Sequence, residues 1–148
     1  MEVDQRLFDA AVEQLRRRWP DAQRGVAAAV YLDDGSIVTG VGLDNINAVM
    51  GLCAETGPIC QAYTLDRSIT ASICVAPGLS GHELQVLAPC GACQERLALW
   101  GPGVEVGVGS TRTDAGWESK PLIEVNPYYW AVVYAEGSGW PSPAEHAD

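Results

Sequence analysis

Two short cysteine-containing strings constrain this chain more than any other feature. The first is Cys53-Ala54-Glu55, and the second is Pro89-Cys90-Gly91-Ala92-Cys93. They supply three sulfur ligands and one carboxylate, so a fold that uses them together must bring two distant segments to one point. Zinc held by three protein ligands keeps a fourth position open for water, and a neighbouring carboxylate can take a proton from that water. The pattern therefore predicts a hydrolytic zinc site in which Glu55 is the acid and base.

Length, composition and charge narrow the possible classes of protein. A chain of 148 residues with 47% hydrophobic residues can form one domain with a buried core. Its net charge of −10 argues against a nucleic-acid partner, because neutralising phosphates supplies most non-specific affinity for nucleic acid. No apolar run is long enough for a membrane span, and the acidic start does not resemble a secretory signal. We expect a cytoplasmic protein whose cysteines are free thiols or metal ligands.

Hydrophobic periodicity predicts helices that alternate with strands. Helices are expected over residues 3–19, 51–67 and 90–100. Strands are expected over residues 26–32, 36–41, 69–75, 84–87 and 104–108. This order predicts the α/β class, with a sheet flanked by helices.

Several local features carry further expectations. The proline of Gly57-Pro58 is expected to kink the helix that it interrupts. Residues 110–120 are expected to form a polar loop, and residues 122–135 an aromatic closing segment. The composition turns to Gly, Ser, Pro and acidic residues near the end, so we expect one domain over residues 1–136 and a flexible acidic tail over 137–148.

The positions of the cysteines favour a catalytic metal site over a structural one. Cys90 and Cys93 are three residues apart at a predicted helix start, so both can meet one ion. Cys53 is expected in the first turn of another helix, and two helix N-termini help to keep thiolates deprotonated. A closed structural site would need a fourth ligand, whereas Cys60 and Cys74 are expected to be small buried hydrophobic residues. Coincidence is the other alternative, because a lone Cys-x-x-Cys string is a weak signal.

The two strings together resemble the signature of the zinc-dependent cytidine deaminases, a His- or Cys-x-Glu string followed by Pro-Cys-x-x-Cys. The resemblance runs from about Gly25 to Trp130, and residues 34–41 are similar to the family's second strand. A cysteine at position 53 is typical of the small tetrameric enzymes that act on free nucleosides, a form that blasticidin S deaminases share. The resemblance implies a three-layer α/β/α sandwich around a mixed sheet of about five strands. It also implies a homotetramer that takes part in pyrimidine salvage.

The activity that the resemblance implies is hydrolysis of a cyclic amidine. A free cytidine-like nucleoside would become the uridine-like product with release of ammonia, at a Zn²⁺ ion held by Cys53, Cys90 and Cys93. Glu55 would move protons between the water, ring N3 and the leaving amine, and the backbone N–H of Ala54 would bind the base carbonyl. Three alternatives stay open: a nucleoside antibiotic such as blasticidin S as substrate, a nucleic-acid-editing deaminase, and a non-catalytic zinc module. The acidic net charge argues against the second, and an intact Glu55 argues against the third.

The chain departs from the family pattern where the sugar is expected. Family members that bind ribose carry Asn and Glu just before the first zinc string, where this chain has Gly42 and Asp44. Asp44 can still hold a hydroxyl group, but glycine has no side chain that can do so. Asn45 or Asn47 can compensate, although an ordinary turn role is an equal alternative for both.

The resemblance leaves open how the charge of the thiolates is offset. The tetrameric enzymes have arginines directly after each string, where this chain has Thr56 and Gln94. Arg67 or Arg96 can offset the negative charge of three thiolates in their place, although an ordinary exposed position on a helix is the default for both arginines.

Trp130 lies where the family has an aromatic residue that reaches into a neighbour's pocket. It is the candidate to cover the base, and a core or interface position is the alternative.

Overall fold

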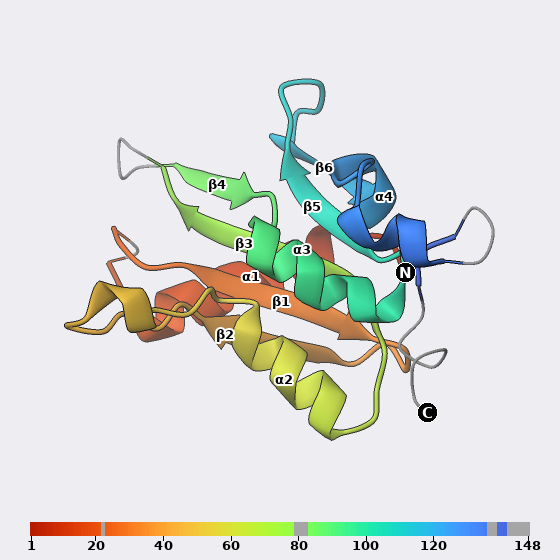
Figure 1. Ribbon diagram of the computed structural model, residues 1–148. Helices are drawn as coiled ribbons and strands as arrows, with labels where there is room; N and C mark the ends of the chain where they lie inside the picture. Colours follow the sequence, from red (N-terminus) through yellow and green to blue (C-terminus); the bar gives the residue numbers. More distant parts are fainter. Residues whose placement is uncertain (22, 79–82, 136–138, 142–148) are drawn as a thin grey trace.

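The computed structural model describes residues 1–21, 23–78, 83–135 and 139–141. Within those residues a six-stranded mixed sheet forms the centre, with helices on both faces (Figure 1). The strands are β1 Ala27–Leu32, β2 Ile37–Val41, β3 Ile69–Pro77, β4 Leu84–Leu87, β5 Glu105–Gly109 and β6 Trp117–Pro121. The helices are α1 Gln5–Arg18, α2 Thr56–Thr64, α3 Gly91–Leu97 and α4 Leu122–Val125. Short 3₁₀ turns are η1 Ala48–Met50, η2 Ala98–Trp100 and η3 Trp130–Tyr134.

The strand order is β2-β1-β3-β5-β6, and β4 pairs with the end of β3. Strand β1 runs antiparallel to both β2 and β3. Strands β3 and β5 are parallel, and the chain between them passes through β4 and α3. This mixed sheet confirms the predicted α/β class, with one strand more than the sequence indicates.

Strand β1 is buried on both faces, which accounts for its continuous run of apolar residues. Ala27, Ala29 and Tyr31 belong to one core cluster with the apolar face of α1. Val30 and Leu32 belong to a second cluster with residues of α2 and α3. The sheet is therefore the middle of three layers, with α1 behind it and α2 and α3 in front (Figure 1).

Helix α1 forms where the apolar stripe predicts it. The Asp4 side chain caps its first turn by accepting a 2.9 Å hydrogen bond from the backbone N–H of Leu7. Its last turn carries Arg16, Arg17 and Arg18, which are exposed. Positive charge at this end suits the helix dipole. No helix among the described residues is long and apolar enough to cross a membrane.

Helix α2 begins later than the sequence predicts. Cys53 is not in its first turn, because the helix starts at Thr56 with Glu55 as the N-cap. Pro58 therefore lies in the first turn, where a backbone N–H has no acceptor within the helix, and the expected kink does not interrupt α2. Residues 53–56 form a turn instead, with a 3.0 Å hydrogen bond from the N–H of Thr56 to the carbonyl of Cys53.

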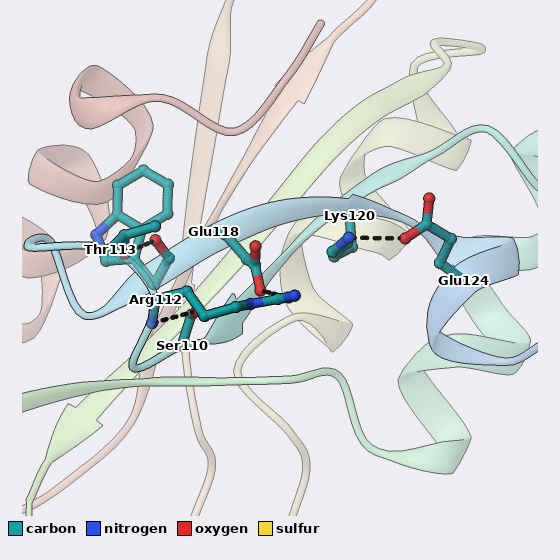
Figure 2. Close-up of polar contacts among 7 residues, drawn as sticks. Ser110, Arg112, Thr113, Glu118, Lys120 and Glu124 are labelled. Atoms are coloured by element: carbon teal, nitrogen blue, oxygen red, sulfur yellow. Dashed lines mark hydrogen bonds and ion pairs between the residues drawn. The ribbon is translucent and has the colours of Figure 1, made fainter.

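Strand β6 is the element that the sequence does not predict. Part of the expected polar loop over residues 110–120 pairs antiparallel with the whole of β5. Figure 2 shows the polar contacts of this hairpin, in which Arg112 pairs with Glu118, and Lys120 with Glu124 at 2.8 Å. The strand is half-buried along its length. Its pairing with β5, rather than a hydrophobic pattern, holds it in the sheet.

The closing segment over residues 122–135 contains α4 and η3. Of the predicted tail, only residues 139–141 are described, and the remainder lies outside the described residues. Trp140 is buried and stacks on Tyr129 with ring centroids 4.2 Å apart. Trp140, which lies within the predicted tail, therefore belongs to the second core cluster.

Candidate active site and metal centre

Three cysteine sulfurs converge between α2 and α3. The sulfur atoms of Cys53, Cys90 and Cys93 all lie within 4.8 Å of one another, and those of Cys53 and Cys90 are 3.3 Å apart. Cys93 is buried, whereas Cys53 and Cys90 are exposed. Each residue can offer one ligand atom to an ion at their centre. The two strings that are distant in the sequence therefore meet at one point in the fold.

Local structure explains how each cysteine arrives there. Cys90 is the N-cap of α3, so Cys93 lies in the first turn of that helix on the same side. Cys53 lies in the turn before α2 and follows a two-residue bridge between Leu43 and Leu52. The two backbone hydrogen bonds of this bridge are 2.9 and 3.0 Å long. They hold the loop after β2 against the cysteine segment.

The pKa values of the three thiols are shifted in different directions. Burial raises the pKa of Cys93, and the Glu55 carboxylate raises it further. The pKa of Cys53 is raised mainly by its hydrogen bond with Cys90 and then by burial. For Cys90 burial raises the pKa, but the N–H group of Cys93, the thiols of Cys53 and Cys93 and the N–H group of Ala92 together lower the pKa overall. Three thiolates this close require a cation to stay deprotonated together, so the donor set fits a thiophilic ion such as zinc.

Glu55 is a buried carboxylate beside these sulfurs. Its exposed fraction is only 4%, and carboxylates are rarely buried without a specific role. It lines the same cavity as Cys53, Cys74 and Cys90, and its negative charge contributes to the raised pKa values of Cys93 and Cys74. The neighbouring Ala54 is also buried. A carboxylate in this position can exchange protons with a group bound at the sulfur cluster.

One cavity connects the sulfurs, the carboxylate and the loop after β2. It has a volume of about 230 Å³ and is lined by Cys53, Glu55, Cys90, Gly42 and Asp44, among others. Ala54, the residue predicted to bind the base carbonyl, also lines it. The cavity therefore joins the predicted metal and proton-transfer residues to the predicted sugar position.

The two other cysteines behave differently from each other. Cys74 is buried as predicted, and burial raises the pKa of its thiol. It also lines the cavity, a place that the sequence does not indicate because it depends on how β3 packs under α2 and α3. Cys60 is exposed, so the prediction that it is a buried hydrophobic residue is wrong. It lies on the outer side of α2, where the helix faces away from the sheet.

The structure separates the candidate sugar-binding residues. Asp44 lines the cavity, but Asn45 is exposed and is not among the lining residues. Asn47 is the N-cap of η1, and its side chain accepts a 3.3 Å hydrogen bond from the N–H of Val49. This contact gives Asn47 the turn role that the sequence left as an alternative.

Trp130 does not line the cavity of its own chain. It is 63% exposed, and its indole N–H donates a 2.8 Å hydrogen bond to Glu95. With Tyr129, Tyr134 and Leu99 it lines a shallow apolar groove on α3 and η3. Any contact of Trp130 with a bound base would therefore have to be made across a subunit boundary.

The two candidate arginines lie in different parts of the structure. Arg67 forms ion pairs of 2.6 and 2.8 Å with Asp33 and Asp34 in the β1–β2 turn. These contacts hold its guanidinium group at that turn and not at the cysteines. Arg96 donates a 3.2 Å hydrogen bond to the hydroxyl of Thr56, directly after Glu55. Of the two, Arg96 is the one that approaches the site.

Comparison with known proteins agrees with this arrangement. The chain matches the family model described as "Cytidine and deoxycytidylate deaminase zinc-binding region" over residues 1–106. A stretch of 79 residues is 35% identical to a cytidine deaminase of Mycobacterium tuberculosis, covering 53% of this chain and 56% of that protein. A cytidine deaminase of Halalkalibacterium halodurans is 29% identical over 79 residues, which is 57% of its length. The chain thus spans little more than half the length of these curated relatives.

Solved structures match over more of the chain. A cytidine deaminase from Bacillus anthracis superposes with a TM-score of 0.78 and 41% identity, over 88% of this chain and 91% of that one. A cytidine deaminase from Mycobacterium tuberculosis superposes with a TM-score of 0.63 and 27% identity, over 86% of this chain and 98% of that one. The three-layer arrangement around the cysteines is therefore shared with these proteins.

Proposed function

Because this chain belongs to the family with the cytidine and deoxycytidylate deaminase zinc-binding region, we propose that it is a zinc-dependent hydrolase that deaminates cytidine. Water replaces the exocyclic amine of the base, so the products are uridine and ammonia. The observation that carries this proposal is a buried Glu55 beside three converging cysteine sulfurs in one cavity.

In this proposal Cys53, Cys90 and Cys93 hold the zinc ion, and no described protein group completes the coordination. Bound zinc supplies Lewis-acid chemistry that lowers the pKa of a water at the open position. Three thiolates and one Zn²⁺ give a net charge of −1, and Arg96 is the nearest candidate to offset it through Thr56.

Glu55 does the proton transfers. Its carboxylate accepts a proton from the attacking water and delivers it to ring N3, which makes C4 a better electrophile. The same carboxylate then takes the remaining proton from the oxygen added at C4 and delivers it to the amine, so that ammonia rather than an amide anion leaves and the C4 carbonyl forms. The backbone N–H of Ala54, in the turn just before α2, donates to the base carbonyl and orients the ring.

The sugar and the outer side of the base involve other groups of the chain and, we infer, a second subunit. Asp44 is placed to accept a hydrogen bond from a sugar hydroxyl, and Asn45 can approach only if its loop moves. Trp130, Tyr128 and Tyr134 are exposed aromatic residues, and an apolar surface of this kind favours self-association. We propose a homotetramer in which Trp130 of one subunit covers the base in another.

Three broader statements belong to the same proposal. Residues 1–136 act as one deaminase domain, the enzyme works in the cytoplasm, and its reaction belongs to pyrimidine salvage. The relatives are cytidine deaminases, so they do not favour a nucleoside antibiotic or a nucleic acid as the substrate. The net charge of −10 supports the exclusion of nucleic acid.

The decisive experiment follows the loss of cytidine absorbance with purified, zinc-loaded protein. Glu55→Gln should retain zinc and fold but lose about 100-fold or more of the rate, because an amide cannot shuttle a proton. Glu13→Gln, on the exposed side of α1, is the matched control and should leave the rate unchanged. Near-normal turnover by Glu55→Gln would remove Glu55 from the mechanism, and turnover of a single-stranded oligonucleotide but not cytidine would reject the proposed substrate.

A further inference from the structure

A side-chain hydrogen bond joins the two helices that follow the cysteine strings. Nη1 of Arg96 donates a 3.2 Å hydrogen bond to the hydroxyl of Thr56, and the two residues are 40 positions apart in the sequence. Arg96 belongs to α3, whereas Thr56 is the first residue of α2. Among the residues that the structure describes, no other hydrogen bond connects these two helices. The contact therefore links two segments that no local pattern of the sequence brings together.

Arg96 lies on the side of α3 that carries a zinc ligand. It follows Cys93 by three residues, so the two side chains share one face of the helix. Leu97 packs in the second core cluster together with Ile59 of α2, so α3 is already held close to α2 at this level. No carboxylate among the described residues forms an ion pair with Arg96. Its guanidinium group is thus free to hold the neighbouring helix.

The other end of the contact belongs to the turn that carries Cys53 and Glu55. The N–H of Thr56 donates a 3.0 Å hydrogen bond to the carbonyl of Cys53, which closes this turn. Glu55 directly precedes Thr56 and is the N-cap of α2. Both Thr56 and Arg96 are half-buried, where a hydrogen bond is stronger than in water. A group that fixes the Thr56 hydroxyl therefore restrains the proposed ligand and the proposed proton carrier at once.

A second polar contact of α3 shows the difference between a local restraint and a long-range one. Nε2 of Gln94 donates a 2.8 Å hydrogen bond to the carbonyl of Pro89, five residues earlier. This bond orients the segment around Cys90 relative to its own helix, but it does not reach the first string. A metal site built from two strings binds its ion best when both are already in position. Arg96 supplies the restraint between the strings that Gln94 cannot supply.

We propose that Arg96 is a positioning residue, which holds the turn of residues 53–56 on α3 through the Thr56 hydroxyl. In this role it prolongs the lifetime of bound zinc and keeps Glu55 in place for proton transfer. The inference rests on the proposed function and goes beyond an offset of charge. A positive charge acts on the thiolates whatever its hydrogen-bond partner is, whereas positioning requires the hydroxyl at position 56. The two roles therefore differ in a variant that keeps the arginine and loses the hydroxyl.

The test measures the rate at which zinc-loaded protein releases its metal to an excess of a chromogenic chelator. Thr56→Val keeps the branched shape of threonine without the hydroxyl, and Arg96→Met keeps an unbranched side chain without the donors. Each variant should release zinc about tenfold faster or more, the usual effect of losing a group that orients metal ligands. Thr56→Ser retains the hydroxyl and should release zinc at the wild-type rate.

Two further variants serve as internal checks. Arg96→Met/Thr56→Val should release zinc no faster than the faster single variant, because the same bond is lost in each case. Arg16→Met removes an equal charge from the exposed end of α1, on the opposite face of the sheet, and should leave the release rate unchanged. With zinc in excess, kcat for cytidine should fall in Thr56→Val while KM changes little, because Glu55 acts in the chemical step.

The outcomes separate this inference from the proposed function. If the wild-type protein binds no zinc or does not deaminate cytidine, the proposed function fails. If it does both, but Thr56→Val and Arg96→Met release zinc at the wild-type rate, only the positioning role is rejected. Faster release from Arg96→Met but not from Thr56→Val would show that the arginine acts by charge, which also rejects positioning. The comparison of Thr56→Val with Thr56→Ser remains decisive even if Arg96→Met folds poorly.

Discussion

Replacing Gly40 by alanine tests how closely β2 must approach the segment that carries Glu55. A Cβ at position 40 would lie 2.4 Å from Cδ of Pro58 and 2.5 Å from the carbonyl oxygen of Ala54. The first atom belongs to a rigid ring and the second to the backbone, so neither can move aside cheaply. The structure therefore predicts that α2 and the turn before it must shift away from the sheet in this variant.

Two opposing effects set the change in the free energy of unfolding that Gly40→Ala should cause. Alanine restricts the unfolded chain, which stabilises the fold by about 0.4–1 kcal/mol where the native backbone tolerates it. Overpacking of a well-packed region costs about 1–3 kcal/mol, and two contacts shorter than 3 Å place Gly40→Ala near the upper end. The free energy of unfolding should thus fall by about 2 kcal/mol, which lowers the melting temperature by about 4–8 °C for a chain of 148 residues.

The assay is thermal unfolding of zinc-loaded protein, with Gly42→Ala as the matched control. The nearest atom to a Cβ at position 42 would be the Leu52 carbonyl oxygen at 3.6 Å, an ordinary contact. Gly42→Ala should therefore melt at the wild-type temperature or slightly above it. Zinc content and cytidine turnover should fall in Gly40→Ala, because the Ala54 carbonyl lies between Cys53 and Glu55. Equal melting temperatures for the two variants would refute the close approach of β2.

Three further predictions concern the metal, the sugar and alkaline stability. Cys93→Ala should reduce bound zinc well below one ion per chain, whereas Cys60→Ala should keep it, as metal analysis of the purified variants can show; unchanged zinc in the first variant would contradict the ligand set. Gly42→Asn should raise kcat/KM for cytidine by about 3- to 10-fold, the worth of one hydrogen bond, and an unchanged or lower value would show that Asp44 suffices. Burial and then the hydrogen bond to Asp4 raise the pKa of Tyr31, so the folded state keeps this proton longer than the unfolded state as pH rises. Stability should therefore be complete below about pH 10 and fall above it, and denaturant unfolding of Tyr31→Phe should show a weaker fall; an identical alkaline profile in both proteins would exclude this contribution.

The central chemistry of the site was accessible from the sequence because its determinants are local. The spacing of Cys90 and Cys93 places both thiols in one helical turn wherever that helix lies. The Cys53-Ala54-Glu55 string likewise sets a carboxylate two residues from a thiol. The apolar run of β1 and the amphipathic stripe of α1 predicted a sheet with helices on its faces, and the structure has that arrangement. Each of these inferences needs only neighbours along the chain.

Strand β6 and the start of α2 were missed for related reasons. The residues of β6 are mixed in character and form a strand because β5 offers a partner for their backbone groups. The start of α2 depends on where Gly40 of the neighbouring strand allows Pro58 to pack. Both outcomes are decided by a partner far away in the sequence, so no local pattern can report them.

The cavity and its surroundings were decided by the tertiary structure alone. Composition did not distinguish Arg67 from Arg96, and only packing directs the first to the β1–β2 turn and the second to Thr56. The amino-acid sequence indicates which groups can perform the proposed chemistry, because bonding capacity belongs to each residue. Which of them face the same space depends on how the layers pack, and packing is a property of the whole chain.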